Sequence, residues 1–347
     1  MEIRELLLLC IEKKASDLHL TENEPPILRI DGRLHRQALA PLNRQDLKRI
    51  IYSVLTNPQK EMFEKSLELD FSLALPLLDR FRVNMHLQRG CAEAAFRRVP
   101  LEIPRIEDLG LPSIITDLAR KPNGLFLVTG PTGVGKTTTL ASVINLINNE
   151  RECLIMCIED PIEFVHSNKK SIIKQREVYS DTHSFAEALR HCLRQDPNVI
   201  VVGEMRDLET ISTALTAAET GHLVLATLHT PDAPQTIERI IDVFPPYQQQ
   251  QVKLQLSDCL QGVVSQLLLP RVDHGRIMAC EIMIATAGIR NLIREQEIEQ
   301  IPTLMQTGSQ YGMKTMDKSL KELFQQGLIS LDTAMSKVKN PEEFRQL

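Results

Sequence analysis

The 347-residue sequence predicts an α/β protein in which a small α+β domain, over residues 1–98, precedes a larger domain with a mostly parallel sheet. Two patterns in residues 113–285 predict the larger domain. Segments typical of strands alternate with segments typical of helices, an order that produces a parallel sheet covered by helices. The strand-like segments are apolar throughout and show no alternation with polar residues, as expected of strands that are buried on both faces.

Composition and charge narrow the class of protein. The hydrophobic content of 43% and the charged content of 24% are ordinary for a soluble globular chain, and the length suggests two or three domains. The net charge of −5 argues against nucleic-acid binding, which usually needs a basic surface. The seven cysteines are scattered and odd in number, so we expect reduced thiols in a cytosolic protein. The apolar run at residues 6–11 is too short for a membrane span and has acidic flanks unlike those of a signal peptide.

The first domain has a strong hairpin signal. Asp31-Gly32 separates two short apolar-rich runs, residues 27–30 and 33–35, and a type I′ turn needs positive φ at both central positions. Asn43 and Asp46 are placed to cap a helix that runs to about residue 57, and Pro58 to begin another. The remaining elements expected here are a helix over residues 2–14 and strands over residues 67–75, 80–86 and 94–99.

Prolines at 100, 104 and 112 predict a linker over residues 99–112, after which Ser113 is expected to cap a short helix that ends before Pro122. The larger domain follows. Its expected strands cover residues 124–129, 153–158, 199–202 and 223–228, and its expected helices cover residues 137–148, 184–194 and 207–219, with Ser184 and Glu187 as a capping box. Residues 286–347 predict a helical C-terminal region with helices near residues 288–295, 316–326 and 331–338.

One glycine-rich stretch lies between the first of these strands and its helix. It fits G-x-x-x-x-G-K-[ST], the Walker A phosphate loop, in the strand–loop–helix setting that separates this motif from a chance glycine turn. Backbone N–H groups and the helix N-terminus favour phosphate binding there. Lys136 is expected to reach the β- and γ-phosphates, and the Thr137 hydroxyl to hold Mg²⁺. The predicted nucleotide-binding residues are Gly130, Pro131, Thr132, Gly133, Val134, Gly135, Lys136, Thr137 and Thr138.

The other strands of this sheet end in acids or a histidine. Because ligands bind at the carboxyl ends of the strands in such sheets, these side chains should share one rim with the phosphate loop. Glu204 follows an apolar strand in the usual place of the Walker B acid, so we expect it to bind Mg²⁺ directly or through water. Glu163 is the candidate that polarises the attacking water. Glu159 and Asp160 are open alternatives for either role, which includes Glu159 as a metal ligand.

Two histidines flank the last strand of this series. His229 follows it and is expected to sense or stabilise the γ-phosphate. His222 precedes it, about 20 Å away at a rise of about 3.3 Å per residue, so both cannot touch one phosphate. For His222 we expect a structural role or a place at an interface.

Arginines cluster on the last two strands of the first domain, at positions 80, 82, 97 and 98. A solvated strand face would explain them. So would contact with a phosphate of the chain's own nucleotide or of a neighbour's, where an arginine stabilises transition-state charge. A similar choice arises for Ile289, Leu292 and Ile293, which lie at helical spacing and either pack on the domain or bind a partner.

These residues resemble a known family over nearly the whole chain. The sequence is similar to the type II/IV secretion ATPases and, within them, to the branch of pilus retraction (twitching motility) ATPases. The similarity is carried by the Walker A loop and by the runs ASDLHL (15–20), RFRVN (80–84), IEDPIE (158–163), VGEMRD (202–207), AETGH (218–222), TLHT (227–230) and IRNLIRE (289–295).

The resemblance implies a PAS-like first domain, a RecA-like ATPase core and a homohexameric ring that hydrolyses ATP with Mg²⁺. It implies that the nucleotide lies between the two domains, which favours Arg82 and Arg97, and Arg80 less, as contributors to catalysis. It also implies that Glu163 is the catalytic glutamate. The motor would act on a polytopic platform protein at the cytoplasmic face of the inner membrane, with or without a paralogous retraction ATPase. Residues 289–295 would be needed for retraction beyond hydrolysis.

Three other functions compete with pilus retraction. Pilus-assembly and type II secretion ATPases carry an extra N-terminal domain and usually a four-cysteine metal insert, neither of which is present in this sequence. A DNA-translocating RecA-type motor is disfavoured by the acidic balance of the chain. A structural or regulatory ring without hydrolysis is disfavoured by the acids at the strand ends.

Overall fold

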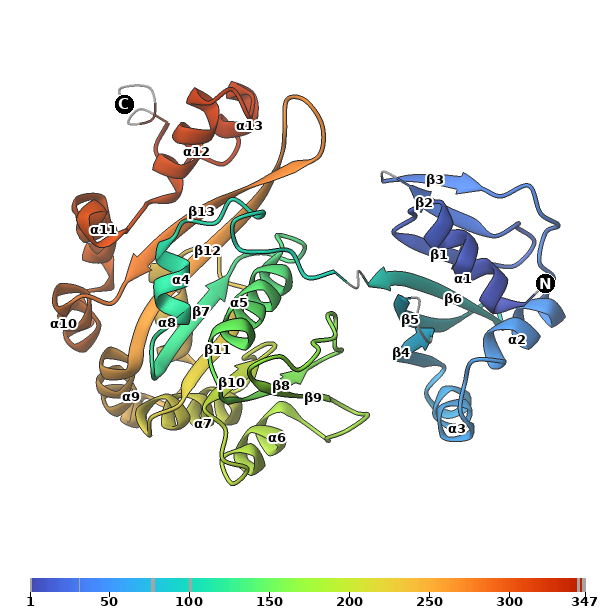
Figure 1. The fold of residues 1–347 in the computed structure, drawn as a ribbon, viewed down its shortest axis with the longest axis horizontal. Helices are drawn as coiled ribbons and strands as arrows, with labels where there is room; N and C mark the ends of the chain where they lie inside the picture. Colours follow the sequence, from blue (N-terminus) through green and yellow to red (C-terminus); the bar gives the residue numbers. More distant parts are fainter. Residues whose placement is uncertain (1, 31, 76–78, 100–101, 342–343, 345–347) are drawn as a thin grey trace. The chain divides into compact units, whose positions relative to one another are not determined.

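The protein is described by a computed structural model that covers residues 2–30, 32–75, 79–99, 102–341 and 344 (Figure 1). The chain divides into two compact units. The first comprises Met1–Glu102 together with Pro161–Val165, and the second comprises Ile103–Asp160 together with His166–Leu347. Each unit has its own hydrophobic core.

The first unit is built on a six-stranded antiparallel sheet with the strand order β3-β2-β1-β6-β5-β4. Three helices contribute to its core, in which Phe63, Phe81 and Phe96 are fully buried. The strands are β1 (Asp17–Leu20), β2 (Ile27–Ile30), β3 (Arg33–Arg36), β4 (Glu68–Leu75), β5 (Asp79–Gln88) and β6 (Cys91–Val99), and the helices are α1 (Ile3–Glu12), α2 (Arg44–Tyr52) and α3 (Asn57–Ser66).

Local signals in the first unit are largely confirmed. The β2–β3 hairpin forms as predicted, although Asp31 of its turn lies outside the described residues. The Asn43 side chain accepts a hydrogen bond from the backbone N–H of Asp46, at 2.9 Å, and so caps α2. That helix ends at Tyr52, several residues earlier than predicted, and α3 has a proline in its first turn as expected.

The second unit contains a seven-stranded sheet with the order β13-β12-β7-β11-β10-β8-β9. All neighbouring strands run parallel except the antiparallel pair β12–β13 at one edge. The mostly parallel sheet is therefore confirmed. Its strands are β7 (Gly124–Thr129), β8 (Leu154–Glu159), β9 (Ile172–Glu177), β10 (Val199–Val202), β11 (Leu223–Leu228), β12 (Leu260–Pro270) and β13 (Arg276–Ile284).

Helices cover both faces of this sheet, as the uniformly apolar strands predict (Figure 1). Successive residues of β7 point to opposite sides: Leu125 and Leu127 join one buried cluster, and Phe126 and Val128 join the other. The second cluster contains α4 (Ile114–Ala119) and α5 (Lys136–Glu150), and the first contains α6 (Phe185–Cys192), α7 (Leu208–Glu219), α8 (Ala233–Asp242) and α9 (Pro246–Cys259).

Some predictions for the second unit were wrong or incomplete. Ser113 does not cap α4: its φ of −57° and ψ of −26° are helical, whereas a capping residue is extended so that its hydroxyl can reach the N–H groups of the first turn. Among the described residues of this unit, the strands β9, β12 and β13, the helices α8 and α9, and the short elements between residues 298 and 311 had no predicted counterpart.

The C-terminal helices begin where the sequence predicts. In α10 (Ala287–Glu295), the apolar residues Ile289, Leu292 and Ile293 are buried in the core of the second unit, so packing on the domain is the correct choice for them. The remaining elements are η1 (Ile298–Gln300), α11 (Ile301–Thr307), η2 (Gly308–Tyr311), α12 (Met316–Gln325) and α13 (Leu331–Met335). Within the described part of the chain, every helix is too short or too polar to span a bilayer. Each of the seven cysteines is a free thiol.

Candidate nucleotide site

The glycine-rich loop joins β7 directly to α5, which confirms the strand–loop–helix context. Gly130, Gly133 and Gly135 have φ values of 135°, 84° and 92°, in the region that favours glycine. At Gly130 a side chain would also meet the backbone: a Cβ there would lie 2.5 Å from the carbonyl oxygen of Gln266 on β12. The glycines thus allow a tight turn whose end is the free N-terminus of a helix, a natural site for phosphate.

Lys136 is buried at the base of the loop, with 8% of its surface exposed. Its Nζ donates to the carbonyl oxygens of Gly130, at 2.6 Å, and Pro131, at 3.0 Å. The loop therefore holds an ammonium group in a fixed place beside the helix N-terminus. A cation held in that position is suited to pair with the terminal phosphates of a nucleotide.

His229 links the loop to the acid that follows β10. Its Nδ1 lies 3.4 Å from Lys136 Nζ and 3.3 Å from the Thr132 hydroxyl. Its Nε2 lies 3.2 Å from Glu204 Oε1, and the other oxygen of Glu204 accepts from Arg206 at 2.6 Å. The structure thus brings His229, Glu204 and the phosphate loop together on one rim, as the strand ends predict.

Glu204 is held in its ionised form. Burial opposes ionisation, but the hydrogen bond and charge of Arg206 and the proximity of His229 outweigh it, so the pKa of Glu204 falls below its ordinary value. A carboxylate that is charged at neutral pH is what a metal-binding role requires. Its carboxylate is already engaged by two partners, which a metal ion would have to share or displace.

The remaining predicted residues occupy several places. Thr137 and Thr138 lie in the first turn of α5. Glu159 ends β8, where its carboxylate accepts from the Gln175 amide at 2.9 Å. Glu163 belongs to Pro161–Val165, which groups with the first unit, and there its Oε1 lies 3.9 Å from Nη1 of Arg82 on β5. Arg97 lies opposite Arg82 in the β5–β6 register.

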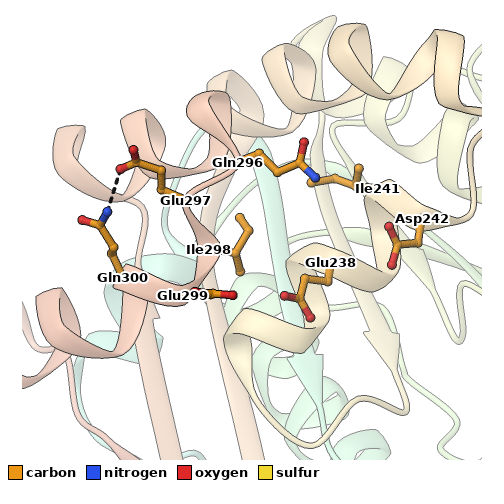
Figure 2. Close-up of a pocket in the computed structure, with 8 residues that line it drawn as sticks. All are labelled: Glu238, Ile241, Asp242, Gln296, Glu297, Ile298, Glu299 and Gln300. Carbon is orange, nitrogen blue, oxygen red and sulfur yellow. Dashed lines mark hydrogen bonds between the residues drawn. The ribbon is translucent and has the colours of Figure 1, made fainter.

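A pocket of about 420 Å³ lies elsewhere in the second unit, between α8 and the turn that follows α10 (Figure 2). Four carboxylates line it, and within it Gln300 donates to Glu297 at 2.9 Å. None of its lining residues is a predicted site residue. They are Glu238, Ile241, Asp242, Gln296, Glu297, Ile298, Glu299 and Gln300. The phosphate loop, rather than this pocket, carries the chemistry of a nucleotide site.

Comparison with known proteins identifies the family. The family model described as "Type II/IV secretion system protein" matches residues 2–336. The chain belongs to this family. It is 49% identical to the type IV pilus retraction ATPase PilT of Pseudomonas aeruginosa over 99% of this chain and 100% of the relative. It is also 49% identical to a twitching motility protein of Neisseria gonorrhoeae, over 91% of this chain and 85% of the relative.

A solved structure agrees with these relatives. The crystal structure of the pilus retraction motor PilT with bound ADP superimposes with a TM-score of 0.94 at 48% identity, and the match covers 100% of both chains. The predicted membership of the type II/IV secretion ATPases and the α/β fold are therefore confirmed. The bound ADP of that relative also supports nucleotide binding by the family.

In this family member, Arg97 has a partner within its own unit. Its Nε donates to Asp17 Oδ1 at 2.8 Å, and Arg29 approaches the other oxygen of Asp17 at 3.5 Å. Asp17 is 5% exposed, whereas the side chain of Arg97 is 70% exposed. Arg97 thus compensates a buried charge while most of its side chain stays accessible.

The Asp17–Arg97 pair should make stability depend on pH. Burial raises the pKa of Asp17. The hydrogen bonds from Arg97 and Ser16 and the charge of Arg97 lower it by more, so the net shift of the pKa is downward. A carboxyl whose pKa is lowered on folding contributes stability above its unfolded pKa of about 3.9, and that contribution disappears as the pH falls through the folded value. Thermal unfolding should show the wild-type protein more stable than Asp17→Asn at pH 7, with the difference closing below about pH 4. A difference that is constant from pH 7 to pH 3 would contradict this.

Sequence reasoning missed two contributors to the nucleotide site. Arg206 belongs to the Walker B run, but the sequence predicted no role for it. Gln266 lies on β12, a strand that was not predicted. The apolar run around Gln266 was the available signal for that strand. His222 lies with its Nδ1 2.9 Å from the Ala217 carbonyl oxygen near the end of α7, and the choice between a structural role and a place at an interface stays a prediction.

Proposed function

We propose that the chain is an ATP-hydrolysing motor that assembles as a homohexamer and drives type IV pilus retraction (twitching motility). The arrangement of Lys136, His229 and Glu204 around the phosphate loop is the observation that carries the proposal. The pilus retraction ATPase and the twitching motility protein to which the chain is 49% identical support the coupling of hydrolysis to retraction. The nucleotide would be bound by residues 130–138.

Mg²⁺ fits the donors at this site. Among the described residues, no three His, Cys, Asp or Glu side chains gather into a site that would hold a metal ion by themselves. Mg²⁺ in nucleotide sites usually has one or two protein oxygens, with phosphates and water as its other ligands. Thr137 and Glu204, with Glu159 as a further candidate, would supply those oxygens. When bound, the ion neutralises charge on the phosphates.

The other side chains of the site have separate roles in phosphate binding, water orientation and charge stabilisation. Lys136 and the loop amides bind and orient the phosphates, and His229 contacts the γ-phosphate. Glu163 accepts a hydrogen bond from the attacking water and so aims it in line with the scissile bond. Arg82 and Arg97 offset the charge that develops in the transition state, and the exposure of both side chains supports that role.

We further propose the domain organisation and cellular setting that the resemblance implies. Residues 1–98 form a PAS-like domain, 99–112 a linker, 113–285 a RecA-like ATPase core and 286–347 a helical region. The ring acts at the cytoplasmic face of the inner membrane on a polytopic platform protein. We expect no nucleic-acid partner.

Hydrolysis by the purified protein tests the proposed chemistry. Glu163→Gln keeps the shape of the side chain but removes the carboxylate that orients water, so kcat should fall by about 10²-fold or more while ADP still binds. Steady-state ATP turnover and ADP titration would measure the two effects. A matched control is Glu64→Gln, a surface carboxylate of α3. Wild-type turnover in Glu163→Gln would remove Glu163 from its role, and absence of turnover in the wild-type hexamer would overturn the proposed function.

A further inference from the structure

Four polar side chains are buried beneath the phosphate loop. Thr129, Ser265 and Gln266 are 0% exposed, and Thr139 is 1% exposed. Thr129 ends β7, Ser265 and Gln266 lie on β12, and Thr139 lies on α5, beside buried clusters that are apolar. Burial of polar groups costs free energy unless hydrogen bonds compensate it. The hydrogen bonds of these four side chains should therefore show why polar residues are buried beneath the loop.

The four side chains connect β12 to both ends of the loop. The Thr129 and Ser265 hydroxyls are 2.8 Å apart, across the β7–β12 pair in which these residues are direct neighbours. The Gln266 amide donates through Nε2 to the Thr139 hydroxyl, also at 2.8 Å. Thr129 immediately precedes Gly130, and Thr139 lies in the first turn of α5. The strand β12 therefore holds the loop at its start and at its end.

Gln266 contacts the loop region through both its backbone and its side chain. Its backbone carbonyl oxygen packs against Gly130. A Cβ at Gly130 would lie 2.5 Å from that oxygen, so only glycine fits there. Its Oε1 is buried and has no hydrogen-bond partner among the described residues. An apolar residue of the same size would avoid the cost of that atom. The amide at this position is therefore explained by the bond that it donates to Thr139.

We infer that Gln266 is a positioning residue for nucleotide binding, a role that rests on the proposed ATPase function. Its bond to Thr139 fixes the first turn of α5, where the backbone N–H of Thr139 donates to the Gly135 carbonyl oxygen at 3.0 Å. The loop amides and Lys136 are thereby aimed before the nucleotide arrives. Without this bond, binding would have to order the loop as well, and affinity would fall.

Isosteric variants test this inference in the full-length protein. Gln266→Met and Thr139→Val each remove the hydrogen bond and keep the volume, and Thr139→Ser keeps the hydroxyl. Ser319→Ala is the control, because Ser319 is also buried and accepts from the backbone N–H of Cys280, at 3.0 Å. The measurements are the Kd of ADP by calorimetry, KM and kcat for ATP, and the melting temperature without nucleotide.

The expected result is a split between affinity and turnover. Gln266→Met and Thr139→Val should each raise the ADP Kd and the ATP KM by about tenfold, with kcat changed less than about threefold. The double variant should match the single ones, because both remove the same bond. Thr139→Ser should bind as the wild type does. Ser319→Ala should lower the melting temperature alone.

The inference is overturned if Gln266→Met and Thr139→Val bind ADP within about twofold of the wild type although they melt earlier, because the pair would then be ordinary core packing. If Gln266→Met does not fold, the comparison of Thr139→Val with Thr139→Ser decides in the same way. A wild-type protein that binds ADP but fails to hydrolyse ATP would overturn the proposed function alone, and the ADP affinities of the variants would still decide the role of Gln266. A wild-type chain that binds no nucleotide would overturn both.

Discussion

Replacement of Lys136 by alanine is expected to abolish ATP hydrolysis, with turnover reduced by about 10²-fold or more. The ammonium group is the cation that the loop carbonyls of Gly130 and Pro131 hold in place, within 3.4 Å of His229. Its loss removes a buried charge placed to meet the terminal phosphates. Nucleotide titration together with steady-state turnover would measure the loss of binding and of rate.

The control for this variant is Lys121→Ala, an exposed lysine of the same unit. It should hydrolyse ATP at the wild-type rate. The Lys136→Ala protein should remain folded, because the side chain is not part of a hydrophobic cluster. Turnover above one tenth of the wild-type rate in a folded Lys136→Ala protein would contradict the assignment of the phosphate site.

Replacement of Arg290 by alanine is expected to destabilise the protein by about 2–4 kcal/mol. Its guanidinium donates to the carbonyl oxygens of Ala285 at 2.9 Å, Asp258 at 2.6 Å and Leu260 at 2.7 Å, and also to that of Ser257. Three of these carbonyls, those of Ser257, Asp258 and Leu260, lie at the end of α9, where helix carbonyls lack partners within the helix. Arg290 therefore caps α9 at the point where β12 begins.

Two matched variants test whether the stability comes from the hydrogen bonds of Arg290 rather than from other side chains of α10. Arg290→Lys should recover only part of the stability, since an ammonium group cannot reproduce a planar fork of donors. Asn291→Ala should change stability by less than about 0.5 kcal/mol, because Asn291 is exposed. Chemical denaturation of the three variants measures this order. Equal stability of Arg290→Ala and the wild type would contradict the capping role.

The contacts of Arg290 also decide which variants can test residues 289–295 for a role in retraction. Loss of retraction in Arg290→Ala would reflect packing as well as any contact with a partner. Asn291→Ala is the cleaner probe, because its side chain lies on the exposed face of α10. Normal hydrolysis with lost retraction in that variant would assign the exposed face to a partner.

Elements with a local signal were predictable from the sequence. The strand Leu223–Leu228 matches its prediction at both ends, because an apolar run bounded by His222 and His229 has clear limits. The edge strand β9 was not predictable in this way. Its residues Lys174, Gln175 and Arg176 are polar, since an edge strand is only partly buried. Likewise, α9 begins with a run of glutamines that carries almost no amphipathic signal.

The candidate site shows the same division between local and distant information. The loop residues and Glu204 were predicted because strand ends and glycine spacing are local features. The bond of Gln266 to Thr139 joins residues 127 positions apart, and that of Arg97 to Asp17 joins residues 80 positions apart. Neither pairing leaves a pattern in one sequence. The choice for Arg97 between a solvated face and a phosphate contact therefore omitted its partner in the structure.

The pilus phenotype of a deletion strain tests the central claim most directly. In the organism that encodes this chain, its gene would be deleted and then restored as the wild type or as Glu163→Gln, and surface pili would be counted beside twitching motility. The account predicts hyperpiliated, non-twitching cells in the deletion strain, no rescue by Glu163→Gln and full rescue by the wild-type gene. Cells without pili after the deletion would contradict it, because they would identify a motor for assembly rather than for retraction.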